Sequence, residues 1–491
     1  MLTTQRRGRL SRLTAALGAS ALALLGAVSI ASSASAAEPF DMPTDDGSLT
    51  IHKFEQPSPV GSANNDGGTI DTTGLTALGN VEFTVYPITD VDLTTEAGWD
   101  LARDYAADTS LATTLGTPIV LTTGVDGSTS TQTLPVGAYL VVETDSSGAT
   151  LPNGDPANVV LEAAPFVVTV PIPLGEGTWN SDVHVYPKNS LTQATKSVQN
   201  PDEYGLGSIV TWSVDVKVPS LPEGETFTEF HITDTLDPRL AYVASSAQVS
   251  LDGTPIGFTE SFTGADADGR GGTLAVSLDA AALTSLAAAP GGIVTLEFDT
   301  TVHGLGDIPN TATVFINEPT TGSGTETNEV NTYWGDVAIL KHATGDVNAT
   351  LAGASFSVYA TEADALAGTN PIVANGATEF TTGADGTVSI PGLWAGETAT
   401  SSQTYWLVET VAPAGYILDS TPIEVVVNAG SLTQPVSVSV PNAQESQLTL
   451  PLTGAEGTTS LMIGGGALLL IATGLAMYSM SRRRQAAVET N

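Results

Sequence analysis

The chain contains no cysteine among its 491 residues, so no disulfide can stabilise it. Basic residues are also few, because 15 Lys and Arg stand against 53 Asp and Glu, a formal net charge of −38. This acidity argues against nucleic acid or an anionic membrane surface as a partner. Aromatic residues make up only 6% of the chain. Val-rich alternating segments recur instead, and they predict about three all-β modules of roughly 150 residues each.

The two ends of the chain carry export and anchoring patterns. Residues 1–36 contain a basic region, an apolar run over 17–30 and the sequence Ala34-Ser35-Ala36, which predicts a signal peptide cleaved after Ala36. The apolar run is short for a membrane span. An exported protein without disulfides needs another source of stability.

A short motif near the C-terminus precedes a long apolar run. The motif consists of Leu450, Pro451, Leu452, Thr453 and Gly454. We expect a stalk with this motif at 444–459, a transmembrane helix at 460–481 and a basic cytoplasmic tail at 482–491. The combination resembles the L-P-x-T-G cell-wall sorting signal, although a simple tail-anchored protein is the alternative. The resemblance implies that a sortase cysteine attacks the Thr453 carbonyl and passes the acyl group to an amine.

A second motif spans residues 179–189. Side chains alternate along a strand, so Asn189 is expected to face a core and Lys188 to face solvent. Taken alone, this is a strand end with a surface lysine. The run resembles the motif W-x-x-x-V-x-V-Y-P-K of sortase-assembled Gram-positive pilins. That resemblance implies that the Lys188 amine accepts the C-terminus of the next subunit.

The segment between the motifs divides into three modules, expected at 37–189, 190–335 and 336–443. The first and third read as diverged copies, each with an apolar-x-apolar-x-Lys strand, a Phe-x-Val-Tyr strand, a Val-Glu-Thr strand and a final strand ending near Asn. The first also carries a mildly helical excursion at 94–114. Such self-similarity predicts tandem β-sandwich modules arranged in a rod.

Lysine is scarce, and each module offers one on the core face of its first strand. The chain has five lysines: Lys53, Lys188, Lys196, Lys217 and Lys341. A buried lysine is costly unless it is neutral or paired, and a neutral amine is a nucleophile. An Asn carboxamide and a proton-shuttling acid beside it would allow condensation with loss of ammonia. A buried salt bridge is the alternative, and Lys217 falls on a polar face.

Residues 405–416 resemble the pilin E-box, and the strands around them resemble a CnaB-type immunoglobulin-like domain. The middle module resembles a CnaA-type domain, and the first module carries only a partial E-box. The resemblance implies the isopeptide cross-links Lys53–Asn189, Lys196–Asn328 and Lys341–Asn442, with Glu143, Asp234 and Glu409 as proton shuttles. Asn310 competes with Asn328, and Asp237 competes less well with Asp234.

Other chemistry is not indicated by the sequence. The five His residues show no metal-ligand spacing. Asp266 and Asp268 are expected to form a solvated turn and not a Ca²⁺ loop. No Ser–His–Asp set or phosphate loop is present. We therefore expect no metal, no cofactor and no enzymatic activity on external substrates.

The combined resemblance implies a secreted backbone (major) pilin, anchored to peptidoglycan. Its expected partners are a pilin-specific sortase, identical subunits in a covalent homopolymer, and tip or basal pilins, with a host ligand that the sequence does not name. A non-polymerised wall-anchored adhesin and an ancillary basal pilin are the alternatives.

Overall fold

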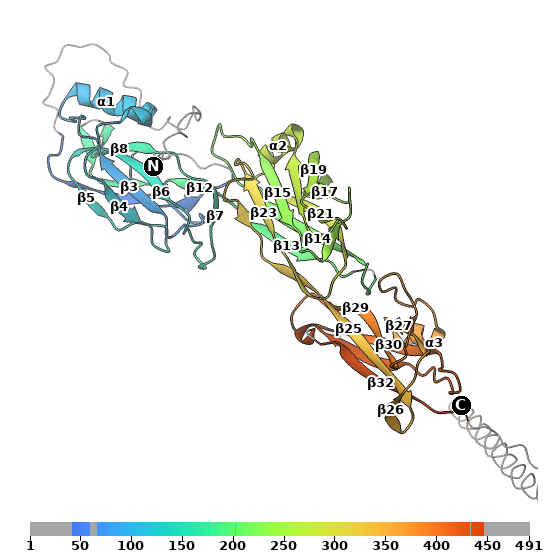
Figure 1. Ribbon diagram of the computed structural model, residues 1–491. Helices are drawn as coiled ribbons and strands as arrows, with labels where there is room; N and C mark the ends of the chain where they lie inside the picture. Colours follow the sequence, from blue (N-terminus) through green and yellow to red (C-terminus); the bar gives the residue numbers. More distant parts are fainter. Residues whose placement is uncertain (1–41, 59–65, 176, 202, 433, 446–491) are drawn as a thin grey trace, which may run out of the picture.

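The computed structural model describes residues 42–58, 66–175, 177–201, 203–432 and 434–445. These residues form three β-rich domains placed end to end in an elongated rod (Figure 1). The expected all-β fold is therefore confirmed. The signal peptide, the sorting motif with Thr453 and the expected membrane helix lie outside the described residues. Within the described part, no helix has the length and apolar character needed to cross a bilayer.

The N-terminal domain consists of short strands and one helix. Its elements are β1 (Gly47–Ile51), β2 (Phe54–Glu55), β3 (Glu82–Pro87), α1 (Glu96–Ala107), η1 (Thr109–Leu111), β4 (Ile119–Thr122), β5 (Gln132–Leu134), β6 (Gly137–Asp145), β7 (Asn158–Leu161), β8 (Phe166–Val170), β9 (Ile172–Gly175), β10 (Thr178–Asn180), β11 (Asp182–Val185) and β12 (Lys188–Thr192). One sheet has the order β4-β3-β6-β8. Facing strands have the orders β11-β1-β5 and β2-β12-β7, and β1 pairs with β11 in parallel.

The helix α1 confirms the helical pattern expected at 94–114. It begins after Thr95, whose hydroxyl accepts a hydrogen bond from the Gly98 N–H at 3.0 Å. It packs on β8, and its Trp99 ring lies 5.9 Å from the ring of Trp179, the first residue of the 179–189 motif. The first residue of the motif is thus packed against the helix.

The middle domain is a sandwich of two sheets. Its elements are β13 (Ala194–Val198), β14 (Ile209–Lys217), β15 (Phe230–Thr235), β16 (Leu240–Tyr242), β17 (Gln248–Leu251), β18 (Thr254–Pro255), β19 (Phe258–Thr263), β20 (Thr273–Leu278), α2 (Ala280–Ala287), β21 (Ile293–Val302), β22 (Gly306–Asn310), β23 (Ala312–Ile316) and β24 (Thr325–Glu326). The sheets have the orders β13-β14-β21-β17-β18 and β19-β20-β15-β23-β24. Alternate residues of β14, including Trp212 and Val214, are fully buried between them.

The C-terminal domain shares its first strand with the middle domain. Its elements are β25 (Val330–Ala343), β26 (Asp346–Thr350), β27 (Ser355–Tyr359), α3 (Glu362–Ala367), β28 (Phe380–Thr381), β29 (Thr387–Gly396), β30 (Ser402–Val411), β31 (Ile423–Asn428), η2 (Ala429–Ser431) and β32 (Val436–Asn442). The start of β25 pairs with β22, and the rest pairs with β29 and β32. The module boundaries expected at 189 and 335 thus fall inside the continuous strands β12 and β25.

The outer domains are structural copies of one another. In the first, Phe83 pairs with Glu143, Val85 with Val141, and the register shifts next to Phe83. In the third, Phe356 pairs with Glu409, Val358 with Leu407, and the register shifts next to Phe356. The two strands that carry the repeated Phe-x-Val and Val-Glu-Thr segments therefore pair with the same register in both domains.

Candidate functional site

Lys53 lies in the core of the first domain, between β1 and β2. Its side chain is 0% exposed, and its Nζ donates a hydrogen bond to Glu143 Oε2 at 2.6 Å and another to Asn189 Oδ1. The Asn189 Nδ2 donates in turn to Glu143 Oε1. The Phe83 ring, its centroid 5.5 Å from Nζ, covers the amine. The three groups thus form a closed, dry triangle in which each touches the other two.

A backbone group completes this first site. The Ala163 N–H donates to Asn189 Oδ1 at 2.8 Å and lies 3.1 Å from Glu143 Oε2. A donor aimed at the carboxamide oxygen would stabilise the negative charge that develops there when an amine attacks the carbon. Sequence reasoning missed this donor, because a backbone N–H can come from any residue type.

The third domain contains the same triangle. The Lys341 Nζ donates to Asn442 Oδ1 and lies 3.2 Å from Glu409 Oε1. The Asn442 Nδ2 contacts both Glu409 oxygens at 2.9 Å. The Phe356 ring centroid lies 5.7 Å from the amine. The predicted residue sets of the first and third domains are thus brought together.

The middle domain holds its lysine differently from the prediction. The Lys196 Nζ donates to Asp234 Oδ2, and the rings of Trp212 and Phe298 lie 5.5 and 5.1 Å from it. Asn328 is exposed and binds the Lys196 backbone, accepting from its N–H at 2.9 Å and donating to its carbonyl at 3.0 Å. The predicted pairing of the Lys196 amine with Asn328 is therefore wrong in this geometry.

Asn310, the alternative weighed from the sequence, occupies the place expected of Asn328. It is 3% exposed, at the end of β22. Burial raises the pKa of the Asp234 carboxyl, and the Asn310 amide is close enough to oppose that rise, as Lys196 also does. Neither of its amide atoms makes a well-aligned hydrogen bond within the described residues, and Asp234 Oδ1 is also unpaired there. Asp237, the other alternative, is instead bound by the Arg239 guanidinium at 2.6 Å.

Burial shifts the pKa of the three site lysines and of Asp234. It lowers the pKa of Lys53 to about 8, with Glu143 opposing the change. Burial likewise lowers the pKa of Lys196 and of Lys341, and it raises the pKa of the Asp234 carboxyl. A neutral amine beside a protonated acid is the state from which condensation with an amide can start.

Lys188 sits on the opposite face of β12 from Asn189, as the alternation predicts. It is half-buried, and its Nζ donates to the Tyr186 carbonyl at 3.3 Å. Burial lowers its pKa. Each of the other four lysines has a carboxylate oxygen within 3.2 Å, whereas Lys188 has no such ion pair within the described residues. Although the chain is strongly acidic, Lys188 is the one lysine whose amine has no carboxylate partner among the residues that the structure describes.

Lys217, which the sequence places on a polar face, forms an ion pair between two domains. Its Nζ lies 2.9 Å from Glu55 Oε1 of the first domain. Nearby, the Ser190 hydroxyl donates to the Ser220 carbonyl, and the Ser220 hydroxyl donates to the Pro57 carbonyl. These bonds fasten the first domain to the second, directly beside the strand that carries Lys188.

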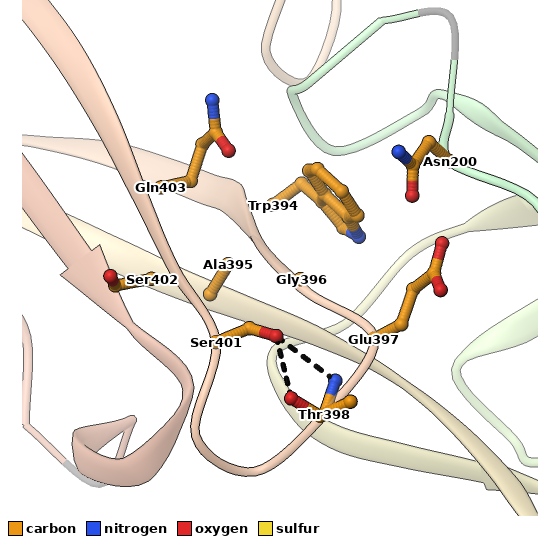
Figure 2. Close-up of a pocket in the computed structure, with 9 residues that line it drawn as sticks. All are labelled: Asn200, Trp394, Ala395, Gly396, Glu397, Thr398, Ser401, Ser402 and Gln403. Atoms are coloured by element: carbon orange, nitrogen blue, oxygen red, sulfur yellow. Dashed lines mark hydrogen bonds between the residues drawn. The ribbon is translucent and has the colours of Figure 1, made fainter.

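A shallow cavity of about 220 Å³ lies at the junction of the second and third domains (Figure 2). Asn200 faces Trp394 and Glu397 across it, while the Ser401 and Thr398 hydroxyls are hydrogen-bonded to each other at 2.7 Å. Trp394 packs its ring against Tyr204, with 5.9 Å between centroids. The cavity contains none of the lysine sites. No group of metal-binding side chains occurs in the described part of the chain.

Comparison with known proteins gives three matching family models. Residues 44–190 match the Gram-positive pilin subunit D1, N-terminal domain. Residues 335–441 match the prealbumin-like fold domain, and residues 446–486 match the LPXTG cell wall anchor motif. The matched segments contain the first lysine site, Lys188, the Lys341 and Glu409 pair of the third domain, and the region of Thr453.

Relatives match over nearly the whole chain. The fimbrial subunit type 2 of Actinomyces naeslundii is 33% identical over 537 residues, covering 96% of this chain and 97% of the relative. The full-length major pilin SpaD of Corynebacterium diphtheriae shares the fold, with a TM-score of 0.66 and 24% identity over 84% of this chain and 100% of that one. The major pilin SpaA of the same organism has a TM-score of 0.57 and 25% identity, covering 81% and 100%. Its structure is described as pointing to a modular pilus assembly stabilizing isopeptide bonds.

Proposed function

Because the chain belongs to the family of Gram-positive fimbrial subunits, a cell wall-anchored surface family, we propose that it is the backbone subunit of a pilus shaft. In this proposal a class C sortase, specific for pilins, links successive subunits through Lys188 and Thr453. The polymer is then attached to peptidoglycan. The observation that carries the proposal is the pairing pattern of the lysines, in which only Lys188 lacks a carboxylate within the described residues.

The linking reaction is an acyl transfer to an amine. The sortase cysteine attacks the Thr453 carbonyl, the Thr453–Gly454 amide breaks, and a thioester forms. The neutral Lys188 amine then attacks that thioester, an amide forms, and the cysteine leaves as a thiolate. An amine held half-desolvated and away from carboxylates loses its proton more readily than a salt-bridged one.

The internal sites are proposed to form isopeptide bonds without an external enzyme. In each, the neutral lysine amine attacks the Asn side-chain carbon and a C–N bond forms. The neighbouring acid gives a proton to the departing amide nitrogen and takes one from the attacking amine, so the C–N bond of the carboxamide breaks, ammonia leaves and the acid is unchanged. The proposed bonds are Lys53–Asn189 with Glu143, Lys196–Asn310 with Asp234, and Lys341–Asn442 with Glu409. Each joins segments far apart in sequence, and in the third domain it joins the first strand, β25, to the last, β32. Pulling along the rod would then load a covalent bond, which compensates for the absence of disulfides.

The test of the polymer is a pair of lysine variants. Cells producing Lys188→Ala should lose the high-mass ladder of surface polymers, while Lys217→Ala, whose lysine lies close by but is paired with Glu55, should retain it. A ladder that persists in Lys188→Ala would refute the linkage. It would favour a wall-anchored adhesin or a different acceptor.

A further inference from the structure

A row of aromatic rings lies on the outer face of the Lys188 strand. In the parallel pairing, Thr50 lies beside His184, and four residues later Phe54 lies beside Lys188. Because side chains alternate along extended chain, His52 and Phe54 share a face with His184, Tyr186 and Lys188. The face turned to the core carries Val183 and Asn189 instead.

The rings on this face are stacked. The His52 ring lies 4.9 Å from the Tyr186 ring at an interplanar angle of 11°, and 5.1 Å from the His184 ring at 22°. The Tyr186 and Phe54 rings lie 6.4 Å apart at 15°. The row therefore runs His184, His52, Tyr186, Phe54, and Phe54 is the strand neighbour of Lys188.

Hydrogen bonds anchor the row on both sides. His52 shares hydrogen bonds of 2.8 Å with the Ser128 hydroxyl and with His184 Nδ1. The Tyr186 hydroxyl accepts from the Ile70 N–H at 3.1 Å and lies 3.4 Å from the Gly68 carbonyl. Tyr186 is thus held at its ring and its hydroxyl, which fixes the backbone carbonyl that accepts from the Lys188 amine.

We propose that the stacked row of His52, Tyr186 and Phe54 is a positioning device for the Lys188 amine, an inference that rests on the proposed function. The row holds the stem of Lys188 half-buried at its end and aims the amine at a neutral carbonyl. The amine is thereby presented to the incoming thioester with little hydration to lose. His52, Tyr186 and Phe54 act through Lys188 and are positioning residues.

The row also contains a histidine whose pKa is shifted by its surroundings. Burial and the neighbouring His184 lower the pKa of His52, and Asp126 opposes them. His184 lies 3.6 Å from Asp182, and Lys53 lies behind the strand, near enough to interact electrostatically with Lys188. Since His52 and His184 share one hydrogen bond, a second proton would place two cations side by side. We therefore expect the row to loosen at acidic pH.

The experiment measures the reactivity of Lys188 in the intact secreted chain. N-hydroxysuccinimidyl acetate is applied between pH 5 and pH 9, and acetylation of Lys188 is compared with that of Lys217 by peptide mass spectrometry. His52→Ala should lower the ratio of Lys188 to Lys217 acetylation at pH 7.5 by roughly threefold to tenfold, because one pKa unit changes the free amine tenfold. His52→Phe keeps a stacking ring, so it should restore the ratio lost in His52→Ala but abolish the fall in the ratio at acidic pH.

A second variant and a sortase assay separate the possible failures. Tyr186→Phe keeps the ring but removes the anchors to Ile70 and Gly68, and it should lower the ratio less than His52→Ala. With purified sortase, His52→Ala should raise the KM for the acceptor subunit more than it lowers kcat. An unchanged acetylation ratio and pH profile in His52→Ala would overturn the positioning role. If His52→Ala lowers the acetylation ratio as expected, but Lys188→Ala still forms polymers, the positioning role stands and the proposed function is overturned.

Discussion

Lys341 and Glu409 meet 3.2 Å apart in a core where their side chains are 0% and 1% exposed. A buried ion pair of this kind gains little over an apolar pair, because desolvation offsets the attraction between the charges. Here the Asn442 carboxamide contacts both groups, and the Phe356 ring closes the site to water. As a salt bridge this arrangement contributes little stability, but it places the groups correctly for a covalent bond between Lys341 and Asn442.

Removing Glu409 should therefore block the bond in the third domain. Glu409→Ala keeps both reacting groups but lacks the proton shuttle, so the secreted chain should be heavier than expected for the fully linked form by one ammonia. It should also lose about 3–5 kcal/mol of stability in that domain, because the lysine is left buried and unpaired. Intact mass and calorimetry check both results.

The control for this variant is Glu424→Ala, an exposed acid on the adjacent strand β31. It should keep the ammonia loss and the melting temperature of the parent. If Glu409→Ala still loses the same number of ammonia molecules as the parent, Glu409 is not the catalyst.

In the middle domain, mass spectrometry distinguishes the two asparagines. In Asn310→Ala the mass deficit of the secreted chain, relative to the mass of its sequence, should be one ammonia smaller than in the parent. Asn310 is the buried carboxamide beside Asp234, so without it the middle bond cannot form. Asn328→Ala should keep the linked mass and lose about 1–2 kcal/mol, the value of its two hydrogen bonds to the Lys196 backbone. The opposite pattern would restore the pairing predicted from the sequence.

The outer sites could be predicted because alternation along a strand fixes which side chains share a face. Alternation from the neighbouring apolar residues of each strand placed the side chains of Lys53 and Lys341 in the domain core. The same alternation placed Asn189 in the core and Lys188 on the outer face. The alternation failed for Asn328, because β24 ends at Glu326 and β25 begins at Val330. The residues between them are not in a strand, so the period of two does not carry across. Asn310 follows the alternation, because it lies in β22 two residues after the buried Ile308 and is therefore buried on the same face.

Contacts between modules could not be predicted from local patterns. The polar face of Lys217 was evident from Ser213 and Asp215, yet its partner Glu55 lies 162 residues earlier, in another domain. The Ala163 N–H of the first site likewise has no residue signature. Such pairings depend on how the domains and loops pack in three dimensions, and the alternation of single strands does not encode that.

The junction between the second and third domains predicts a stiff rod. Tyr204 stacks on Trp394 at 5.9 Å and meets Tyr405 edge-on at 6.1 Å, while its carbonyl accepts from the Trp394 N–H. Tyr204→Ala should cost about 1–3 kcal/mol and broaden the distribution of interdomain distances in small-angle X-ray scattering. Tyr242→Ala, which removes a ring packed within the middle domain, should leave that distribution unchanged. A rod equally stiff without Tyr204 would show that the continuous strand β25 suffices.

The lowered pKa of Lys53 predicts a pH dependence that appears only when its bond cannot form. In Asn189→Ala the amine stays free, with a pKa of about 8 in the fold against 10.5 when unfolded. Between these values the unfolded chain binds the extra proton, so stability should rise with pH from about 8 to 10. The full effect is on the order of 3 kcal/mol. Thermal unfolding of the first domain should reveal it, and the double variant Lys53→Met/Asn189→Ala should lack the slope. If Asn189→Ala instead loses stability over this range, Lys53 is not held near neutrality by burial, and the proposed nucleophile of the first site is wrong.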